Sequence, residues 1–339
     1  MTEPLSEIAK AMVAPGKGIL AADESTPTIK KRFDTIGAES TEENRRDYRE
    51  MLFRTPAMKD FISGVILFEE TLRQSAADGT PMVDIIKSHG SIPGVKVDQG
   101  TKPLAGHSGE LVTEGLDGLR SRLKEYYGLG ARFAKWRAVI TIGKDIPSSG
   151  CISANTHALA CFAALCQEVG LVPIVEPEVL MDGDHTIDRC FEVTEVTLHA
   201  LYDALAAQRV VLEGTILKPN MVLSGSDCAT QAGPEEVAEK TVQCLKRTVP
   251  SAVPGIVFLS GGQSDIDATA HLGVMNRNYD APWRLSYSYG RALQTAPLKA
   301  WGGDNANIPA AQAAFAHRAR MNGLATSGKW QSSLENEAA

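Results

Sequence analysis

The sequence of 339 residues lacks the features that mark several large classes of protein. No apolar run approaches the roughly 18 residues needed to cross a bilayer, so no membrane-spanning segment is predicted. The longest apolar stretch, near Leu159–Cys166, is typical of a buried helix. Glu3 and Glu7 stand where a secretory signal would be basic and then apolar, so no signal peptide is expected. The GxGxxG and Walker P-loop patterns of nucleotide-binding proteins are both missing.

An excess of positive charge is also missing. Lys and Arg number 34 against 41 Asp and Glu, which gives a net charge of −7 and disfavours nucleic acid or an anionic membrane as a partner. Local basic groups could still bind a small phosphate. The six cysteines contain no CxxC pair and are spread along the chain, so they are predicted to be reduced thiols of a cytoplasmic enzyme.

What the sequence does contain is an alternation of short runs rich in Val, Ile and Leu with longer segments of helical period. Apolar residues make up 43% and charged residues 22% of the chain, as in ordinary globular proteins. Strands separated by helices predict a parallel sheet, and eight such units favour a single closed (β/α)8 TIM barrel of the α/β class over a doubly wound open sheet. The candidate strands are 18–23, 62–68, 94–98, 133–140, 171–178, 214–221, 255–262 and 284–291.

The segments between these runs predict helices, and no Pro- or Gly-rich linker divides the chain. We therefore expect one catalytic barrel domain over residues 1–324. Residues 325–339 are mostly polar or small, and they are predicted to form a mobile, flexible C-terminal tail. The clearest helical segments are Glu43–Phe53, Leu116–Tyr127, Ala154–Val169, Ile187–Gln208 and Pro234–Thr248.

Charged residues lie at or near the ends of many candidate strands, where the active sites of barrels are found. Lys218 ends the run TILK, and both burial and a neighbouring cation would disfavour its ammonium form. A neutral amine could attack a ketone and form an iminium. In the alternative interpretation, Lys218 forms a structural ion pair with Glu176 or Glu178.

Two further pairs of charges occur at a spacing of two, which places each pair on one face of a strand. Lys135 and Arg137 would repel each other unless an anion, either a carboxylate or a substrate phosphate, lies between them. Mutual repulsion between Glu176 and Glu178 would raise the pKa of at least one of them, which suits acid–base catalysis. Alternatively, one of these carboxylates pairs with a lysine and the other is solvated.

Two glycine-containing segments at the last two strands are candidate phosphate sites. Residues 259–264, LSGGQS, and residues 289–291, YGR, could bring backbone N–H groups close to an anion. The segment DGDH offers Asp182, Asp184 and His185 as metal ligands. However, Asp184 suits the N-cap of the following helix and no second His cluster is near, so no metal site is predicted.

Nine ordered motifs between about residues 4 and 330 resemble those of the class I, or Schiff-base, fructose-bisphosphate aldolases. Members of this family fold as (β/α)8 barrels, in agreement with the strand count, and need no metal or other cofactor. The resemblance implies reversible cleavage of fructose 1,6-bisphosphate to dihydroxyacetone phosphate and glyceraldehyde 3-phosphate, in glycolysis and gluconeogenesis. The motifs are GILAADEST, EENRR, GVKVDQG, FAKWR, PIVEPE, LEGTILKPNM, FLSGGQS, SYGRALQ and LKAWGG.

The resemblance also implies roles for individual residues. Lys218 would form the Schiff base, Glu176 would be the acid–base of carbinolamine formation and dehydration, and Lys135 would be the cation beside the imine. Asp23 matches the carboxylate at the C4 hydroxyl, although Glu176 could take that proton instead. The remaining assignments are Glu178 and Arg137 as nearby charged groups, Ser260, Gly261, Gly290 and Arg291 at the 1-phosphate, and Ser25, Arg32, Arg45 and Lys96 at the far end of the substrate.

The chain departs from animal members of the family at its end, where EAA replaces a tyrosine that assists proton exchange at C3. The family further implies a homotetramer. Two other functions are compatible with the motifs: a Schiff-base aldolase for another sugar phosphate, and a non-catalytic scaffold on the same fold. Two phosphate sites argue against a monophosphate substrate. The presence of Lys218, Glu176 and Asp23 argues against a scaffold.

Overall fold

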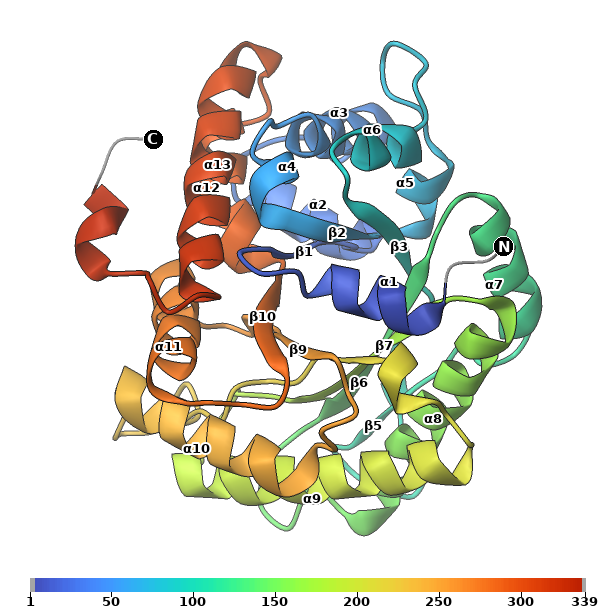
Figure 1. Cartoon of the computed structure of the whole chain (residues 1–339), viewed down its shortest axis with the longest axis vertical. Coiled ribbons are helices and arrows are strands. Elements are labelled where there is room, and N and C mark those ends of the chain that lie inside the picture. Colours follow the sequence, from blue (N-terminus) through green and yellow to red (C-terminus); the bar gives the residue numbers. More distant parts are fainter. Residues whose placement is uncertain (1–3, 337–339) are drawn as a thin grey trace.

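A computed structural model describes residues 4–336, and within them eight parallel strands close into a barrel surrounded by helices (Figure 1). The order around the barrel is β1-β10-β9-β8-β7-β6-β3-β2. Neighbouring barrel strands are therefore also successive barrel strands in the sequence, and β10 closes the barrel against β1. This confirms the predicted fold class. The barrel strands are β1 (Gly18–Ala22), β2 (Ile62–Leu67), β3 (Ile92–Lys96), β6 (Phe133–Ile140), β7 (Val172–Val179), β8 (Ile216–Leu217), β9 (Gly255–Phe258) and β10 (Arg284–Tyr289).

Each predicted run overlaps one barrel strand, but two of the strands are much shorter than predicted. β8 has two residues where the sequence predicts 214–221. The backbone N–H of Lys218 still donates to the carbonyl of Val175 at 2.9 Å, but Pro219 has no N–H and ends the regular pairing. β9 stops before Gly261 and Gly262, whose φ angles of +34° and +90° leave the extended region.

Helices occupy all five predicted segments, and three of them begin at a side-chain cap, one of which is Thr41 before Glu42–Phe53. α8 starts at Ser149 because the Ser148 side chain accepts a hydrogen bond from the N–H of Cys151. Thr186 caps α9 in the same way, so the prediction that Asp184 is the N-cap is wrong. The helices are α1 (Leu5–Met12), α2 (Thr26–Asp34), α3 (Glu42–Phe53), α4 (Met58–Phe61), α5 (Glu69–Arg73), α6 (Met82–Ser88), α7 (Leu119–Gly128), α8 (Ser149–Val169), α9 (Ile187–Ala207), α10 (Pro234–Thr248), α11 (Asp265–Asn278), α12 (Arg291–Trp301) and α13 (Ile308–Ala325).

The sequence analysis missed a small antiparallel hairpin between β3 and α7. Its strands are β4 (Thr101–Pro103) and β5 (Leu111–Thr113). Glu110 fixes the hairpin to the start of α8, because its carboxylate accepts hydrogen bonds from the N–H and hydroxyl of Ser148 at 2.6 Å each. The hairpin therefore supports the segment that leads into α8.

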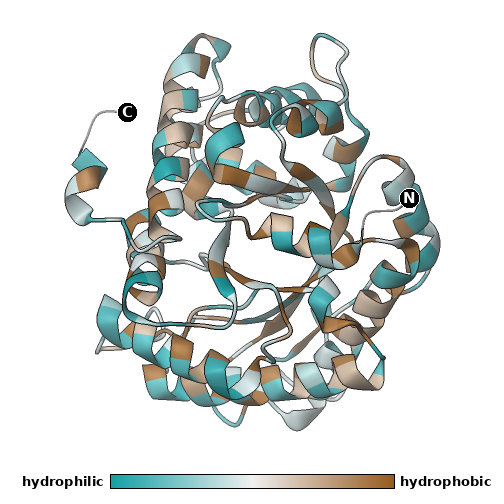
Figure 2. Ribbon diagram, in the orientation of Figure 1, coloured by the Kyte–Doolittle hydropathy of each residue, from teal (hydrophilic) through white to brown (hydrophobic). Residues whose placement is uncertain are grey.

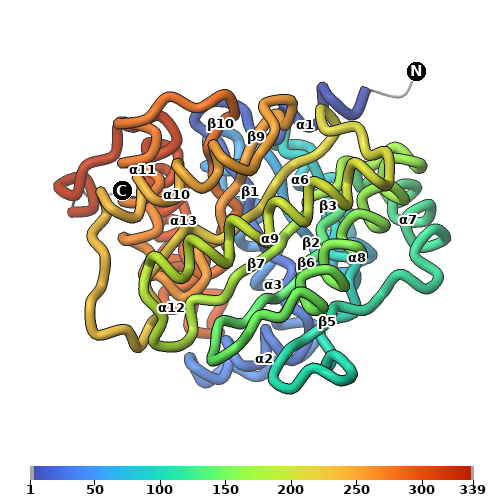
Figure 3. Tube along the Cα trace, turned by 90° about the horizontal axis from the view of Figure 1, so that it is seen from below, coloured from blue at the N-terminus to red at the C-terminus, as the bar shows by residue number. Residues whose placement is uncertain are grey.

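α8 is long and apolar enough to span a membrane by length and composition alone. In the fold it packs against β6, β7 and α9, and Figure 3 shows it beside α9 in the outer ring. The ring of Phe162 on α8 lies 5.8 Å, centroid to centroid, from that of Trp136 on β6. The apolar residues of α8 thus pack the outside of the barrel, as the sequence predicts for a buried helix.

α1 lies across the amino end of the barrel, as Figure 1 shows. Ile8 and Met12 belong to one buried cluster with Phe133, Ile174 and other side chains from the barrel interior. The ring of Phe133 also occupies the space beside Gly94, where an added Cβ would lie 2.2 Å from the ring. The amino end of the barrel is therefore a packed apolar plug.

Residues two apart on a strand point to the same side, so the side chains inside the barrel change along the strands. They are apolar at the amino end and charged at the carboxyl end. On β6, Phe133 belongs to the interior cluster, whereas Lys135 and Arg137 line a cavity at the other end. On β7, Ile174 and Glu176 follow the same order. Figure 2 shows the strands largely in hydrophobic colours and the surrounding helices in both colours. Period-two alternation thus places charged groups at the carboxyl end, where barrel enzymes have their sites.

The last described segment packs against the barrel. α13 ends at Ala325, one residue beyond the predicted domain boundary, and the short helix η3 (Ser332–Asn336) follows. Trp330 is buried, and its indole N–H donates to the Glu335 carboxylate at 2.9 Å. The other oxygen of Glu335 lies 2.5 Å from Arg318 on α13. The terminal EAA lies outside the described residues, and both the domain division and the mobility of the tail stay predictions.

Candidate active site

Four charged side chains from four strands meet at the carboxyl end of the barrel. Lys135 Nζ lies 2.7 Å from Asp23 Oδ2 and 3.0 Å from Glu176 Oε2. Lys218 Nζ lies 3.2 Å from Glu176 Oε1. Asp23 directly follows β1 and Lys218 directly follows β8, so the ends of the strands bring the four groups together. The ion pair proposed as an alternative role for Lys218 exists, and it is part of this cluster.

The cluster is buried, and its charges control one another. Lys135, Glu176 and Lys218 are only 3%, 3% and 4% exposed. Burial by itself would raise the pKa of Asp23, but Lys135 and Lys218 hold it well below its usual range. Burial would likewise lower the pKa of Lys135, but Asp23 and Glu176 raise it. Asp23 is therefore ionised and Lys135 charged near neutral pH.

The sequence predicts a raised pKa for at least one carboxyl of the Glu176–Glu178 pair. For Glu176 the direction is the opposite: burial raises its pKa, but the charges of Lys135 and Lys218 outweigh burial and lower it. Glu178 does not pair with these lysines, because its carboxylate accepts a short hydrogen bond from Arg137. Glu176 is therefore ionised near neutral pH, and a lysine lies against each of its two oxygens.

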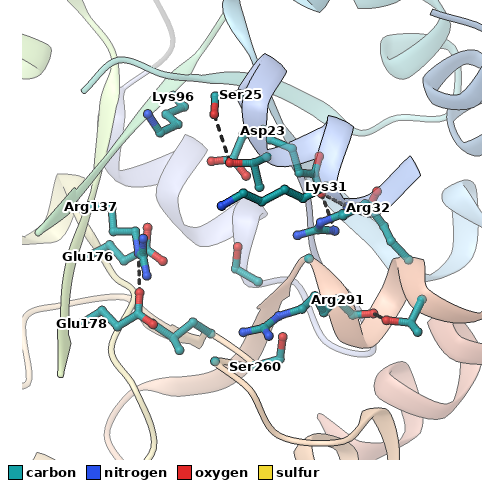
Figure 4. A pocket seen from close by; sticks show the side chains of 18 of the residues that line it. Asp23, Ser25, Lys31, Arg32, Lys96, Arg137, Glu176, Glu178, Ser260 and Arg291 are labelled. Atoms are coloured by element: carbon teal, nitrogen blue, oxygen red, sulfur yellow. Dashed lines mark hydrogen bonds and ion pairs between the residues drawn. The ribbon is translucent and has the colours of Figure 1, made fainter. Parts of the chain in front are cut away.

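The cluster forms the floor of a cavity of about 550 Å³ (Figure 4). Of the fourteen residues predicted for the site, Arg45 alone does not line this cavity. Arg45 instead forms a bidentate pair with Glu70, with N···O distances of 2.9 and 2.7 Å, and donates to the carbonyl of Ser40. The other thirteen are Asp23, Ser25, Arg32, Lys96, Lys135, Arg137, Glu176, Glu178, Lys218, Ser260, Gly261, Gly290 and Arg291.

One wall of the cavity is built from groups that suit an anion. Ser260 follows β9, and Gly261 continues the chain in a positive-φ conformation. Gly290 is the N-cap of α12, so Arg291 stands at the first turn of that helix. Helix N-termini present free backbone N–H groups, and arginine adds a bidentate cation. This wall therefore offers the ligands of a phosphate.

The cavity contains a second set of polar groups, of which Arg32 lies beside Gly290 of the first wall. Ser25 precedes α2, and its hydroxyl lies 3.0 Å from that of Thr28. Lys96 ends β3 and pairs with Asp98 at 2.6 Å, and Arg32 on α2 pairs with Glu24 at 2.6 Å. A second anion could bind here.

Sequence reasoning missed most of the cavity residues that come from helices, and also Glu24, Leu259 and Ser288. The strand ends were searched, but α2 and α12 each contribute a stripe of residues spaced three or four apart, which is one helix face. Starting from Ser25 or Arg291 and stepping along a helical period could have found them. The missed lining residues are Glu24, Thr28, Lys31, Thr35, Leu259, Ser288, Gln294, Thr295, Leu298 and Lys299.

Metal ligation was considered for the DGDH segment. Over residues 4–336, no group of three or more His, Cys, Asp or Glu side chains is arranged to hold a metal ion. Within the same range, neither ring nitrogen of the buried His185 has a hydrogen-bond partner. Burial lowers the pKa of His185, which therefore favours the neutral imidazole.

The fold and the site together define a barrel enzyme with a buried lysine among carboxylates and two sets of anion ligands. The chain belongs to the class I fructose-bisphosphate aldolases, because the model of that family matches residues 4–339. These enzymes are aldehyde-lyases that cleave fructose 1,6-bisphosphate. The family match and the similarity to aldolases over nearly the whole chain assign this activity to the chain.

The similar proteins cover nearly the whole chain. A probable class 1 fructose-bisphosphate aldolase of Xanthomonas campestris is 64% identical over 97% of this chain and 99% of its own length. The cytosolic fructose-bisphosphate aldolase 6 of Arabidopsis thaliana is 58% identical over 94% of this chain and 88% of its own. The solved aldolase of Plasmodium falciparum, in complex with TRAP and a small-molecule inhibitor, has a TM-score of 0.95 at 49% identity and covers 96% of this chain and 95% of that one.

Proposed function

We propose that Lys218 is the nucleophile of the aldolase reaction and forms a Schiff base with the C2 ketone of open-chain fructose 1,6-bisphosphate. The observation that carries this assignment is the contact of Lys218 Nζ with Glu176 at 3.2 Å, in a cavity that is also lined by two sets of anion ligands. An amine must lose a proton before it can attack a carbonyl, and Glu176 is within reach of that proton.

Glu176 serves as the proton shuttle of imine formation. Its Oε1 faces Lys218 and its Oε2 faces Lys135, so one carboxylate contacts both the nucleophile and a fixed cation. After the amine adds to C2, the carbinolamine must lose its hydroxyl as water. Glu176, once protonated by the amine, donates the proton that this step needs.

Asp23 takes the C4 hydroxyl proton, and Lys135 holds it ionised for that task. Glu176 is engaged with the amine, whereas Asp23 is paired with Lys135 and not with Lys218. Loss of the C4 hydroxyl proton breaks the C3–C4 bond and releases glyceraldehyde 3-phosphate. The electron pair of that bond enters the iminium to give an enamine. Protonation at C3 and hydrolysis then release dihydroxyacetone phosphate.

The two phosphates determine the placement of the substrate. Ser260, Gly261, Gly290 and Arg291 bind the 1-phosphate, because the helix N-terminus and the arginine lie on one wall of the cavity. Ser25, Arg32 and Lys96 bind the 6-phosphate. The position of Arg45, outside the lining and fully engaged with Glu70, makes it a supporting residue of this end.

Borohydride trapping tests the nucleophile directly. Reduction in the presence of dihydroxyacetone phosphate should fix one adduct, and mass spectrometry should locate it on the peptide that contains Lys218. Lys218→Arg keeps the charge but cannot form an imine, so cleavage should fall by at least about a thousandfold. Lys96 and Lys135 are internal controls, because an adduct on either of them, or no adduct in an active enzyme, contradicts the assignment.

Two variants separate the proposed roles of the carboxylates. Asp23→Asn should still form an imine with fructose 1,6-bisphosphate, which borohydride traps as a hexose adduct, but should not release products. Glu176→Gln should form that imine slowly. A hexose adduct that accumulates in Glu176→Gln rather than in Asp23→Asn reverses the two assignments.

The assembly and the location of the chain are also proposals. We infer a homotetramer from its membership of the family, and a cytoplasmic location from relatives that are named as cytosolic. Light scattering on the eluting protein should give four times the chain mass of 36.3 kDa. A monomeric mass at working concentration contradicts the tetramer, and fractionation of the source cells tests the location.

A further inference from the structure

Glu24 is a buried carboxylate in the wall of the cavity that the reaction steps do not use. It follows Asp23 at the end of β1 and is only 6% exposed. Its Oε1 lies 2.6 Å from Nη1 of Arg32 and accepts a hydrogen bond from the Gln294 amide at 2.8 Å. A buried carboxylate costs stability unless its partners are well placed. The presence of a buried carboxylate at this position therefore calls for an explanation.

Arg32 is the partner of Glu24 that reaches the substrate space. It lines the cavity, and a Cβ added to Gly290 would lie 3.6 Å from Arg32 Nη2. The guanidinium of Arg32 thus lies between the carboxylate of Glu24 and the N-cap of α12. Figure 4 shows Arg32 and Arg291 on the side of the cavity opposite Arg137, Glu176 and Glu178.

Glu24 itself is fixed from two other elements. Gln294 on α12 donates to both Glu24 and the carbonyl of Ala21 at 2.6 Å, and Tyr48 donates to the Gln294 side-chain oxygen at 3.2 Å. Arg49 on α3 donates to the backbone carbonyl of Glu24 at 2.8 Å, and its Nη2 lies 3.9 Å from Glu24 Oε2. The carboxylate therefore cannot move without breaking contacts to α3 and α12, and a cation opposes its charge on each side.

We propose that Glu24 is a positioning residue that holds the guanidinium of Arg32 in the orientation that binds a substrate phosphate. The proposal rests on the phosphate role of Arg32 given above. An arginine side chain loses considerable rotamer freedom when a ligand fixes it, and prior fixing removes part of that cost from binding. Nη1 of Arg32 is paired with Glu24, and the other donors of the guanidinium are left for the phosphate.

A double-mutant cycle with fructose 1,6-bisphosphate tests this role. Glu24→Gln should raise KM about tenfold, the value of one charge-assisted hydrogen bond, and change kcat less than about threefold. Arg32→Ala should raise KM at least as much. In the Arg32→Ala background, Glu24→Gln should raise KM less than about twofold, because the residue it acts through is gone.

Three outcomes overturn the proposal. The first is an equal factor in KM from Glu24→Gln in both backgrounds. The second is a fall in kcat with unchanged KM, which would mean that Glu24 acts through the neighbouring Asp23. The third is an unchanged KM in Arg32→Ala, which removes the phosphate role of Arg32. Borohydride trapping of Lys218 remains intact in that case if the rest of the proposed function holds, so the two failures are distinguishable.

Two further variants guard against a folding defect. Glu335→Gln removes the carboxylate of another buried pair, at 2.5 Å from Arg318, which does not line the cavity. It should lower the unfolding temperature and leave KM unchanged. Glu24→Asp keeps the charge but shortens the side chain, and should raise KM by less than Glu24→Gln does. If Glu24→Gln does not fold, an unchanged KM in Glu24→Asp overturns the proposal.

Discussion

Replacing Lys135 by methionine tests whether one cation holds the central cluster together. Lys135 Nζ contacts Asp23 at 2.7 Å and Glu176 at 3.0 Å, and the side chain is 3% exposed. Methionine has a similar length and no charge, so the change leaves two buried carboxylates without their shared partner. Removing one member of a buried ion pair costs about 3–5 kcal/mol.

This loss of stability corresponds to a measurable fall in the unfolding temperature. At about 2 °C for each kcal/mol in a chain of this size, we expect Lys135→Met to unfold roughly 6–10 °C below the wild type. The matched control is Lys30→Met, because Lys30 pairs with Asp34 at 2.8 Å on the exposed surface of α2. Exposed pairs contribute little, so this control should shift unfolding by no more than about 1 °C.

The pH dependence of the shift identifies its cause. A carboxyl whose pKa is lowered by folding stabilises the fold above its unfolded value and loses that contribution only as the pH falls through the folded value. In the wild type, burial raises and Lys135 lowers the pKa of Asp23, and the net value lies below 3.8. Without Lys135, burial is less opposed, the folded pKa rises, and protonation at low pH then favours the folded variant.

The difference in unfolding temperature between Lys135→Met and wild type should therefore be largest near about pH 8 and shrink towards about pH 5. Thermal unfolding followed by circular dichroism at several pH values measures it. An equal difference at both ends of that range, or no difference at any pH, refutes the reasoning, because either result means that Lys135 does not offset the charges of Asp23 and Glu176.

Three other predictions concern the phosphate role of Arg291, the independence of the reaction from metal, and the C-terminal segment. Arg291→Ala should raise KM at least about tenfold and change kcat less than about threefold, and an unchanged KM contradicts its phosphate role. Excess EDTA should leave activity intact, and a loss that zinc restores contradicts a Schiff-base mechanism. Deleting the chain after Lys329 should leave turnover within about tenfold but lower the unfolding temperature, because Trp330 and the Arg318–Glu335 pair are lost. A hundredfold loss of turnover in a folded truncation would assign a tail residue to catalysis.

The barrel could be predicted from the sequence because every barrel strand lies in or beside a short apolar run, and segments of helical period separate these runs. The ends of β8 and β9 could not, because they depend on backbone details rather than on hydrophobicity. Pro219 ends one ladder by lacking an N–H, and the chain leaves the extended conformation at Gly261, shortly after the other ladder ends. The N-cap of α9 shows the same limit, since Asp184 and Thr186 are both acceptable caps and only the backbone chooses between them.

The strand-borne part of the site was predictable for a different reason from the helix-borne part. A charge such as Lys135 or Glu176 inside an apolar run stands out against its neighbours. Residues such as Gln294 on α12 or Lys31 on α2 sit on helices that carry many polar residues, so the sequence offers no contrast. Arg45 illustrates the converse, because its motif is specific, yet its side chain turns to Glu70 and away from the cavity.

The pKa of Glu176 shows why a pairwise rule from the sequence can give the wrong sign. Two glutamates at a spacing of two predict mutual repulsion, but a carboxylate responds to every charge around it. Glu178 is engaged by Arg137, while Glu176 has a lysine against each of its oxygens. Those lysines come from β6 and β8, the neighbours of β7 in the barrel, and only the order of strands brings them there. The sign of the shift, and with it the ionised state of Glu176 beside Lys218, thus follows from the closure of the barrel and not from the motif that contains the residue.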